Sequence, residues 1–134
     1  MSRVEKAMEY HKKGYNCSQS IVCTFADKLG MEEQDLFKIA EGLGLGVGDT
    51  CGTCGAVTGM ALVLGMTNST GNLEAPNSKA ATYRKVKEMN DNFRKKNGST
   101  ICRELKGLDT GKILRSCDGC IEDAVVFLEN ELGD

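Results

Sequence analysis

The stretch that decides the fold runs from Glu41 to Met66 and reads EGLGLGVGDTCGTCGAVTGMALVLGM. Its first half carries glycine at alternate positions, so no side chain dictates the path of the backbone there. From Gly55 onward the sequence is apolar on nearly every side, as in a helix without a face in water. We therefore expect a short, buried central helix over 55–66, reached through a segment that can turn tightly or lie close to another chain or ligand.

Cys54 stands at the N-terminus of this expected helix. Unpaired backbone N–H groups and the helix dipole stabilise a thiolate at such a position and lower its pKa. Cys51 comes three residues earlier, so the two form a Cys-x-x-Cys motif. The sequence thus predicts a reactive or metal-binding sulfur on the most buried element.

Length and charge favour one cytoplasmic domain. The 134 residues are enough for one core, and we treat 1–134 as a single helical, cysteine-rich domain. A net charge of −2 gives no reason to expect nucleic acid as a partner. The apolar run after Cys54 is far shorter than the roughly 20 residues that cross a bilayer, and the N-terminus has no apolar signal segment. We expect a cytoplasmic protein without membrane insertion.

Seven cysteines are the unusual feature of the composition, beside a single histidine and a single proline. An odd number cannot pair completely within one chain, and a reducing compartment disfavours permanent disulfides. Metal binding, redox cycling and core filling remain as uses of these side chains.

Apolar residues at helical spacing, with cap residues and glycine stops between them, predict an all-α bundle of about six or seven short helices around the central one. No window alternates with period two for long enough to demand a strand. The basic side of the helix after Pro76 is interpreted as a solvated face. The expected helices cover approximately 2–13, 16–29, 31–43, 55–66, 76–96, 100–106 and 117–132.

Four cysteines fall at or near the start of four different expected helices, namely Cys17, Cys54, Cys102 and Cys117. If those helix ends meet, four partial positive charges surround four sulfurs and stabilise thiolates. Because the chain has one histidine, a metal site here would consist mostly of sulfur, which points to zinc or an iron–sulfur cluster.

Other arrangements stay open. The second Cys-x-x-Cys pair, Cys117 and Cys120, could join Cys51 and Cys54 in a zinc site, although the gap between the pairs is long. Cys54 as nucleophile with Cys51 as resolving thiol would give a thiol–disulfide oxidoreductase. Cys23 lies among apolar residues, so we expect it to be a small side chain of the core. His11 lies on an apolar stripe, so we expect a core histidine.

The string Cys54-Gly55-Ala56-Val57-Thr58-Gly59 resembles the CGAxxG motif of the redox-active family labelled C_GCAxxG_C_C. The lone upstream cysteine of that family matches Cys17, and its two downstream cysteines match Cys102 and Cys117. The resemblance covers nearly the whole chain and implies a small all-helical redox protein.

The chain is also similar to the split-Soret cytochromes, whose related domain is associated with an iron–sulfur centre. Neither Cys-x-x-Cys motif is followed by histidine, because Gly55 and Ile121 stand there, so covalent haem is not expected. We expect Cys17, Cys54, Cys102 and Cys117 to hold a cluster for electron transfer, of the two-iron type, with Cys51 and Cys120 as alternate ligands. A redox partner protein is implied, and the glycine-rich segment could serve close packing, a dimer contact or docking.

Overall fold

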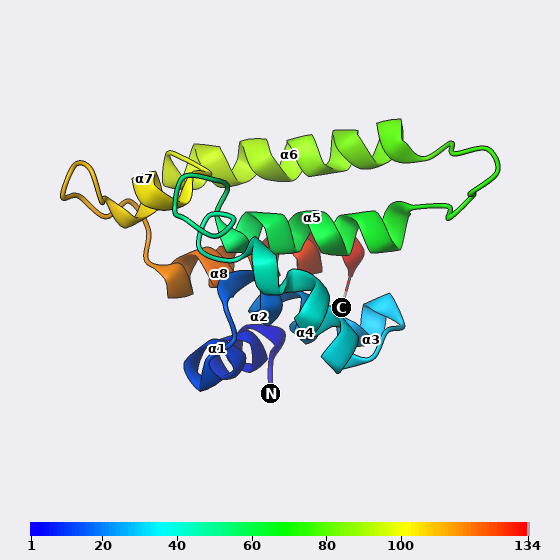
Figure 1. Cartoon of the computed structure of the whole chain (residues 1–134), viewed down its shortest axis with the longest axis horizontal. Helices are drawn as coiled ribbons and strands as arrows, with labels where there is room; N and C mark the ends of the chain where they lie inside the picture. Colours follow the sequence, from blue (N-terminus) through cyan, green and yellow to red (C-terminus); the bar gives the residue numbers. More distant parts are fainter. Residues whose placement is uncertain (134) are drawn as a thin grey trace.

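The computed structural model describes residues 1–133. In that range it contains eight α-helices, one 3-10 turn and no β-strand. This confirms the all-α class that the sequence predicts. Figure 1 shows the arrangement. The elements are α1 (Arg3–Lys13), α2 (Cys17–Thr24), α3 (Ala26–Leu29), α4 (Glu33–Ala40), the 3-10 turn η1 (Glu41–Leu43), α5 (Gly55–Asn68), α6 (Lys79–Asn97), α7 (Cys102–Lys106) and α8 (Cys117–Leu132).

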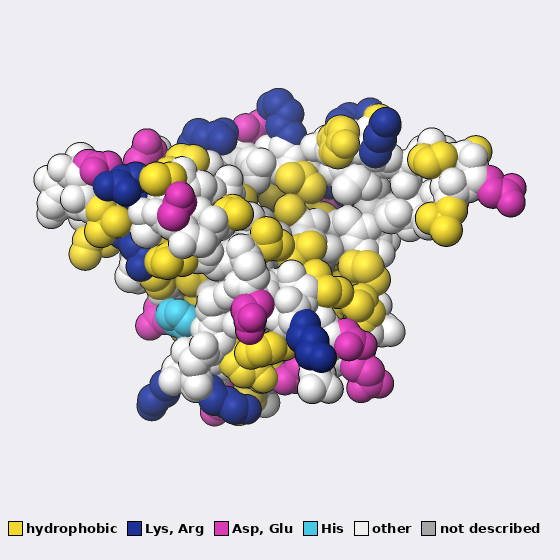
Figure 2. Space-filling model, in the orientation of Figure 1, with side chains coloured by type: hydrophobic (Ala, Val, Ile, Leu, Met, Phe, Trp, Pro, Cys, Tyr) yellow, Lys and Arg dark blue, Asp and Glu magenta, His cyan; other side chains and the backbone are white. Residues whose placement is uncertain are grey.

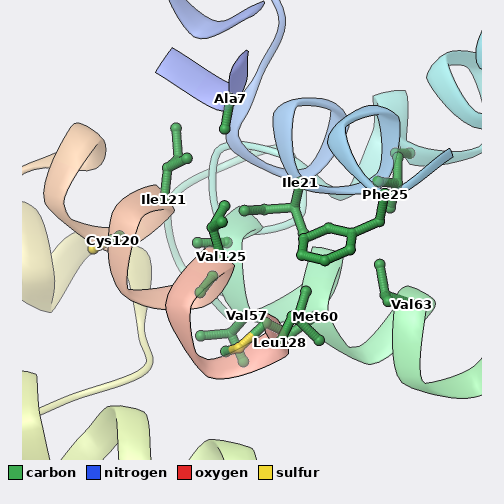
Figure 3. Close-up of a cluster of buried hydrophobic side chains, with 14 of the residues drawn as sticks. Ala7, Ile21, Phe25, Val57, Met60, Val63, Cys120, Ile121, Val125 and Leu128 are labelled. Atoms are coloured by element: carbon green, nitrogen blue, oxygen red, sulfur yellow. The ribbon is translucent and has the colours of Figure 1, made fainter. Parts of the chain in front are cut away.

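Helix α5 is the central element, as expected. It packs against α2, α6 and α8, and Figure 1 shows α6 lying alongside its whole length. Figure 3 shows side chains of α1, α2, α5 and α8 meeting in one core, with Met60 of α5 near Leu128 of α8. The helix is not buried all round, however, because Met66 near its end is 46% exposed. The apolar sequence of α5 therefore extends beyond the part of the helix that is buried in the core.

Glycines in α5 set its distance from α2. A methyl group added at Gly59 would lie 2.8 Å from Cβ of Ile21, and one added at Gly55 would lie 3.0 Å from Cβ of Cys17. Any side chain at these two positions would push the helices apart. In the glycine-rich segment before this helix, a methyl group at Gly46 would lie 2.6 Å from Cβ of Cys102, so of the uses left open for that segment, close packing within the chain is the one that this position shows.

The expected helix over 16–29 is divided in the structure. Phe25 leaves the helical conformation at φ −103° and ψ 16°, which ends α2 and begins α3. Its ring is fully buried and lies under the guanidinium of Arg3, 4.7 Å from the ring centroid. Similarly, the helix expected over 31–43 begins at Glu33 and closes as the 3-10 turn.

Two further expected helix starts were wrong. Helix α6 begins at Lys79 and not at Pro76, because Asn77 and Ser78 hydrogen-bond to Thr70 and stay in the loop. Helix α7 begins at Cys102, with no capping by Ser99, whose hydroxyl instead accepts from the N–H of Ile101.

The outer face of α6 carries the basic side chains that the sequence places there, and Figure 2 shows them along the upper edge of the molecule. Several make ion pairs within the protein: Lys87 and Arg94 with Asp91, and Lys85 with Glu131. Tyr83 on the same helix is 66% exposed.

The close approach of α2 and α5 gives a testable pair of substitutions. Gly59→Ala should destabilise the protein by about 1–3 kcal/mol, because its methyl group would overlap Ile21. Gly65→Ala on the same helix meets nothing within 4 Å and should stabilise it by about 0.5–1 kcal/mol through helix propensity. Urea unfolding of both variants measures the difference, and equal effects would contradict the packing argument.

Candidate cysteine site

Five of the seven cysteines line one cavity of about 160 Å³ at the end of the bundle where helix N-termini meet. They are Cys17, Cys54, Cys102, Cys117 and Cys120. The structure therefore brings together the four cysteines singled out in the sequence and adds Cys120. Cys23 and Cys51 are not part of the lining. The cavity also touches His11, Lys106 and Arg115.

A short antiparallel contact places Cys54 beside Cys102. Thr53 pairs with Ile101 in an isolated β-bridge. The N–H of Cys54 donates to the carbonyl of Thr100 at 2.7 Å, and the N–H of Cys102 donates to the carbonyl of Gly52 at 2.9 Å. The residues before α5 and before α7 are thus held together by backbone hydrogen bonds, and both helices start at the cavity.

Cys17 reaches the cavity as the first residue of α2. Asn16 caps this helix by accepting from the N–H of Gln19 at 2.8 Å, and its amide nitrogen donates to the carbonyl of Glu41 at 3.0 Å. The absence of side chains at Gly44 and Gly55 leaves room for Asn16 and Cys17. The start of α2 is therefore fixed against both the glycine-rich segment and α5.

The glycine-rich segment folds over the cavity in a strained loop. Gly46 is left-handed, and a methyl group there would lie 2.6 Å from Cβ of Cys102. Leu45, Val47 and Thr50 also have positive φ, which is uncommon for residues other than glycine and rarer for β-branched ones. Backbone hydrogen bonds hold the loop, from Thr50 N–H to Leu45 at 2.7 Å and from Arg103 N–H to Thr50 at 2.9 Å. Leu45 closes part of the cavity wall.

Helix α8 supplies two cysteines, Cys117 and Cys120, which lie three residues apart at its start. Ser116 caps the helix by accepting from the N–H of Gly119 at 3.0 Å. The preceding loop is tied to α7 by a hydrogen bond from the N–H of Leu114 to the carbonyl of Leu105 at 2.9 Å. These contacts fix the start of α8, and Cys117 and Cys120 both line the cavity.

Four of the sulfurs form two pairs whose members shift each other's pKa. Cys17 and Cys117 make one pair, and the bond from the Cys17 thiol lowers the pKa of Cys117 to about 5, with Lys106 and then His11 lowering it further. The pKa of Cys17 rises correspondingly, because its proton is held by Cys117 and the side chain is buried. The pKa values of the two thiols are thus shifted in opposite directions, and Cys117 is the more acidic of the pair.

Cys54 and Cys120 make the second pair, with the same asymmetry. The thiol of Cys120 donates to Cys54 and, against the effect of burial, lowers the pKa of Cys54. Backbone N–H groups of Ala56 and Val57 at the start of α5 lower it further, which is the helix N-terminus effect expected from the sequence. The pKa of Cys120 is raised by its bond to Cys54 and by burial.

The expectation of four thiolates stabilised by helix starts is only half right for the metal-free chain. Burial raises the pKa of Cys102, although Lys106 opposes this, and that of Cys17 is raised by its bond to Cys117. A helix N-terminus favours a thiolate only where its N–H groups reach the sulfur and where burial does not cost more.

The two cysteines outside the cavity have separate surroundings. Cys51 is exposed, and its sulfur lies 4.0 Å from Nη1 of Arg103, whose guanidinium is held by Asp109. Cys23 is buried, its thiol points to the carbonyl of Glu33 at 3.7 Å, and burial raises its pKa to about 12. Cys23 is thus a core side chain, and Cys54 has Cys120 and not Cys51 as its bonded neighbour.

Three charged or ionisable cavity residues were not identified as site residues from the sequence. Lys106 follows Cys102 by four positions on α7, a spacing that places both on one helix face and was the available signal. His11 at the end of α1 is half-buried, not a core residue, and its Nδ1 lies 2.7 Å from Oδ1 of Asp118. Nothing in the sequence pattern connects His11 with Asp118, because the two residues lie 107 positions apart.

Arg115 is held at the cavity by a buried carboxylate. Its Nε and Nη2 donate to Asp123 at 3.1 and 3.0 Å, and Lys96 and Asn97 at the end of α6 donate to the same group. Burial alone would raise the pKa of Asp123, but the hydrogen bonds from these three residues lower it on balance. Because the side chain of Arg115 lies where a methyl group at Gly119 would stand, the first turn of α8 needs glycine.

The chemistry of the lining suits a sulfur-bound inorganic group. Thiolates are ligands for zinc and for iron–sulfur clusters, and the cavity has sulfur on several sides. Within residues 1–133, no group of three or more His, Cys, Asp or Glu side chains is arranged to hold a single metal ion. The sulfurs border a volume and do not converge on one point.

These features describe a cysteine-rich helical protein with a thiol-lined cavity. The chain belongs to the family described as "Putative redox-active protein (C_GCAxxG_C_C)", whose profile matches residues 15–131. No curated protein and no solved structure matches the chain. In the part of the chain that is described, no helix has the length and apolar character to cross a membrane.

The charge of Lys106 should be measurable in the reactivity of Cys117. In the metal-free protein, alkylation of Cys117 should continue well below the usual pKa of a thiol, because its pKa is lowered by Cys17, Lys106 and His11. Lys106→Met should raise that pKa by about one unit, which would slow alkylation several-fold near pH 5 and leave it almost unchanged above pH 7. Pulses of iodoacetamide are given between pH 4 and 9, and the rate of alkylation at Cys117 is followed by mass spectrometry of the peptide that contains it.

Lys95→Met removes an equal charge from the exposed face of α6 and serves as the control. An unchanged pH profile in Lys106→Met, or the same change in both variants, would contradict the assignment of Lys106 to the site.

Proposed function

We propose that the cavity binds an iron–sulfur cluster, of the two-iron type, through Cys17, Cys54, Cys102 and Cys117, and that the protein transfers electrons through it. The observation that carries the proposal is that these four cysteines, drawn from the starts of four helices, line one cavity. Membership in a redox-active family agrees with it.

The size of the cavity supports a group of several atoms. Its volume of about 160 Å³ compares with about 30 Å³ for one water molecule in the liquid. Sulfurs around such a space fit a cluster better than a single zinc ion, which needs four ligands at about 2.3 Å from one centre. Zinc remains the alternative cofactor.

Backbone N–H groups and a lysine around the cavity would compensate the negative charge of cysteine thiolates. The backbone N–H groups of Ala56 and Val57 already point to the sulfur of Cys54, and Lys106 acts on Cys17, Cys102 and Cys117. Such groups would hold the thiolates that a cluster requires and would favour its reduced state. When bound, the cluster supplies one-electron transfer. The chain's own residues orient the ligands, and Leu45 and Leu105 limit access of water.

The second candidate function is thiol–disulfide exchange with Cys54 as the nucleophile. The lowered pKa of Cys54 favours it. Cys51 as resolving thiol is less favoured, because Cys51 is exposed beside Arg103 and lies outside the cavity that Cys54 lines. In either case we place the protein in the cytoplasm, where thiols stay reduced, with an electron-carrying protein as its partner.

Anaerobic purification tests the cluster directly. The wild-type chain should show visible charge-transfer absorption, with iron and acid-labile sulfide in equal amounts. Cys102→Ser and Cys54→Ser should lose the colour and most of the iron, because each removes a ligand. Cys51→Ser removes a thiol outside the cavity and should keep both.

Far-UV circular dichroism of each variant controls for folding. Stoichiometric zinc without colour in the anaerobic wild-type protein would overturn the proposal, as would full iron content in Cys102→Ser.

A further inference from the structure

The structure assigns a role to Cys120 that neither the four-cysteine pattern nor the cluster proposal includes. We propose that Cys120 is the resolving thiol of Cys54, so that a small peroxide entering the cavity converts the two into a Cys54–Cys120 disulfide. This inference concerns the metal-free chain and does not depend on cluster binding.

The geometry of the pair carries the inference. Cys120 lines the same cavity as Cys54, where α5 and α8 pack together, and each of the two thiols shifts the pKa of the other. Figure 3 shows Cys120 on α8 at the edge of the hydrophobic core, next to Ile121. The core packing of α5 against α8, with Val57 near Leu128, therefore holds the two sulfurs as neighbours before any oxidation.

Burial decides which oxidant can reach the pair. Cys54 is 6% exposed and Cys120 is 1% exposed, so a bulky disulfide such as oxidised glutathione has no approach to either sulfur. A peroxide is only slightly larger than a water molecule, and the cavity of about 160 Å³ admits it. The cavity thus selects small oxidants for this pair.

The chemistry balances with hydrogen peroxide as the oxidant. The thiolate of Cys54 attacks one peroxide oxygen, the O–O bond breaks, and hydroxide leaves while Cys54 becomes a sulfenic acid. The sulfur of Cys120 then attacks the sulfur of Cys54. The S–O bond breaks, and the hydroxyl leaves with the Cys120 proton as water. Two electrons pass from the two sulfurs to the peroxide.

The neighbour also protects Cys54. A sulfenic acid without a thiol in reach is oxidised onward to sulfinic acid, which is irreversible in most proteins. With Cys120 already in contact, formation of the disulfide competes with that second oxidation, and a dithiol can restore the pair.

The test uses the metal-free chain carrying Cys51→Ser, so that Cys54 is the only cysteine of its motif. After one equivalent of hydrogen peroxide, free thiols are alkylated and the chain is digested with trypsin and an Asp-specific protease. Cleavage before Asp118 separates Cys120 from Cys117. We expect a crosslinked peptide pair containing Cys54 and Cys120, reversed by dithiothreitol.

Two added substitutions on the same turn of α8 give matched comparisons. Cys120→Ser should abolish this crosslink and increase the sulfinic acid at Cys54 several-fold at equal peroxide. Cys117→Ser should leave the Cys54–Cys120 crosslink in place. If circular dichroism shows that the Cys120→Ser variant does not fold, Cys120→Ala replaces it in the same comparison.

Two outcomes would overturn the inference. One is a wild-type pattern in which Cys54 is crosslinked to Cys51 or Cys17 instead. The other is accumulation of Cys54 sulfinic acid while Cys120 stays alkylated in the Cys51→Ser chain. Neither result depends on iron content, so the failure of this inference and the failure of the cluster proposal are distinguishable.

Discussion

The contact between α2 and α5 is the constraint on which the rest of the structure depends. Gly59 against Ile21 and Gly55 against Cys17 bring the two helix axes close enough for their N-termini to share one space. Apolar burial supplies the driving force, since α5 presents Val57, Met60 and Val63 to a core completed by α1, α2 and α8. Gly55 belongs both to this contact and to the lining of the cavity, so the packing of the two helices and the position of the site are linked.

Charge at the cavity is arranged by the same packing. Each helix start brings N–H groups, and Lys106 adds a full positive charge, so negative sulfur is stabilised in a place where burial alone would disfavour it. The stabilisation is uneven. Of the four paired sulfurs, Cys17 and Cys120 have raised pKa values and Cys54 and Cys117 have lowered ones, so each pair joins one of each kind. This asymmetry gives the metal-free site distinct nucleophilic and proton-bearing sulfurs.

The loop over the cavity contains strained backbone, which lowers the stability of the fold and places the loop against the cysteine site. Leu45, Val47 and Thr50 adopt positive φ at a cost of about 1–2 kcal/mol each, and nearby backbone hydrogen bonds offset part of this. In return, the loop runs against Cys102 at Gly46 and covers one side of the site with Leu45. Charged groups line another part of the cavity, where buried Asp123 fixes Arg115 and links α6 to α8.

The sequence by itself determined the helical class, the central helix after Cys54, most helix ends and the four cysteines at helix starts. These are local properties, since apolar periodicity, caps and glycine stops act within a few residues. Only the tertiary structure decided that Cys120 joins the site and Cys51 does not, although both belong to Cys-x-x-Cys motifs. It also decided which sulfurs pair and that Lys106, His11 and Arg115 lie beside them. Which face of a helix start meets the cavity depends on how helices distant in the chain pack, and no local pattern records that.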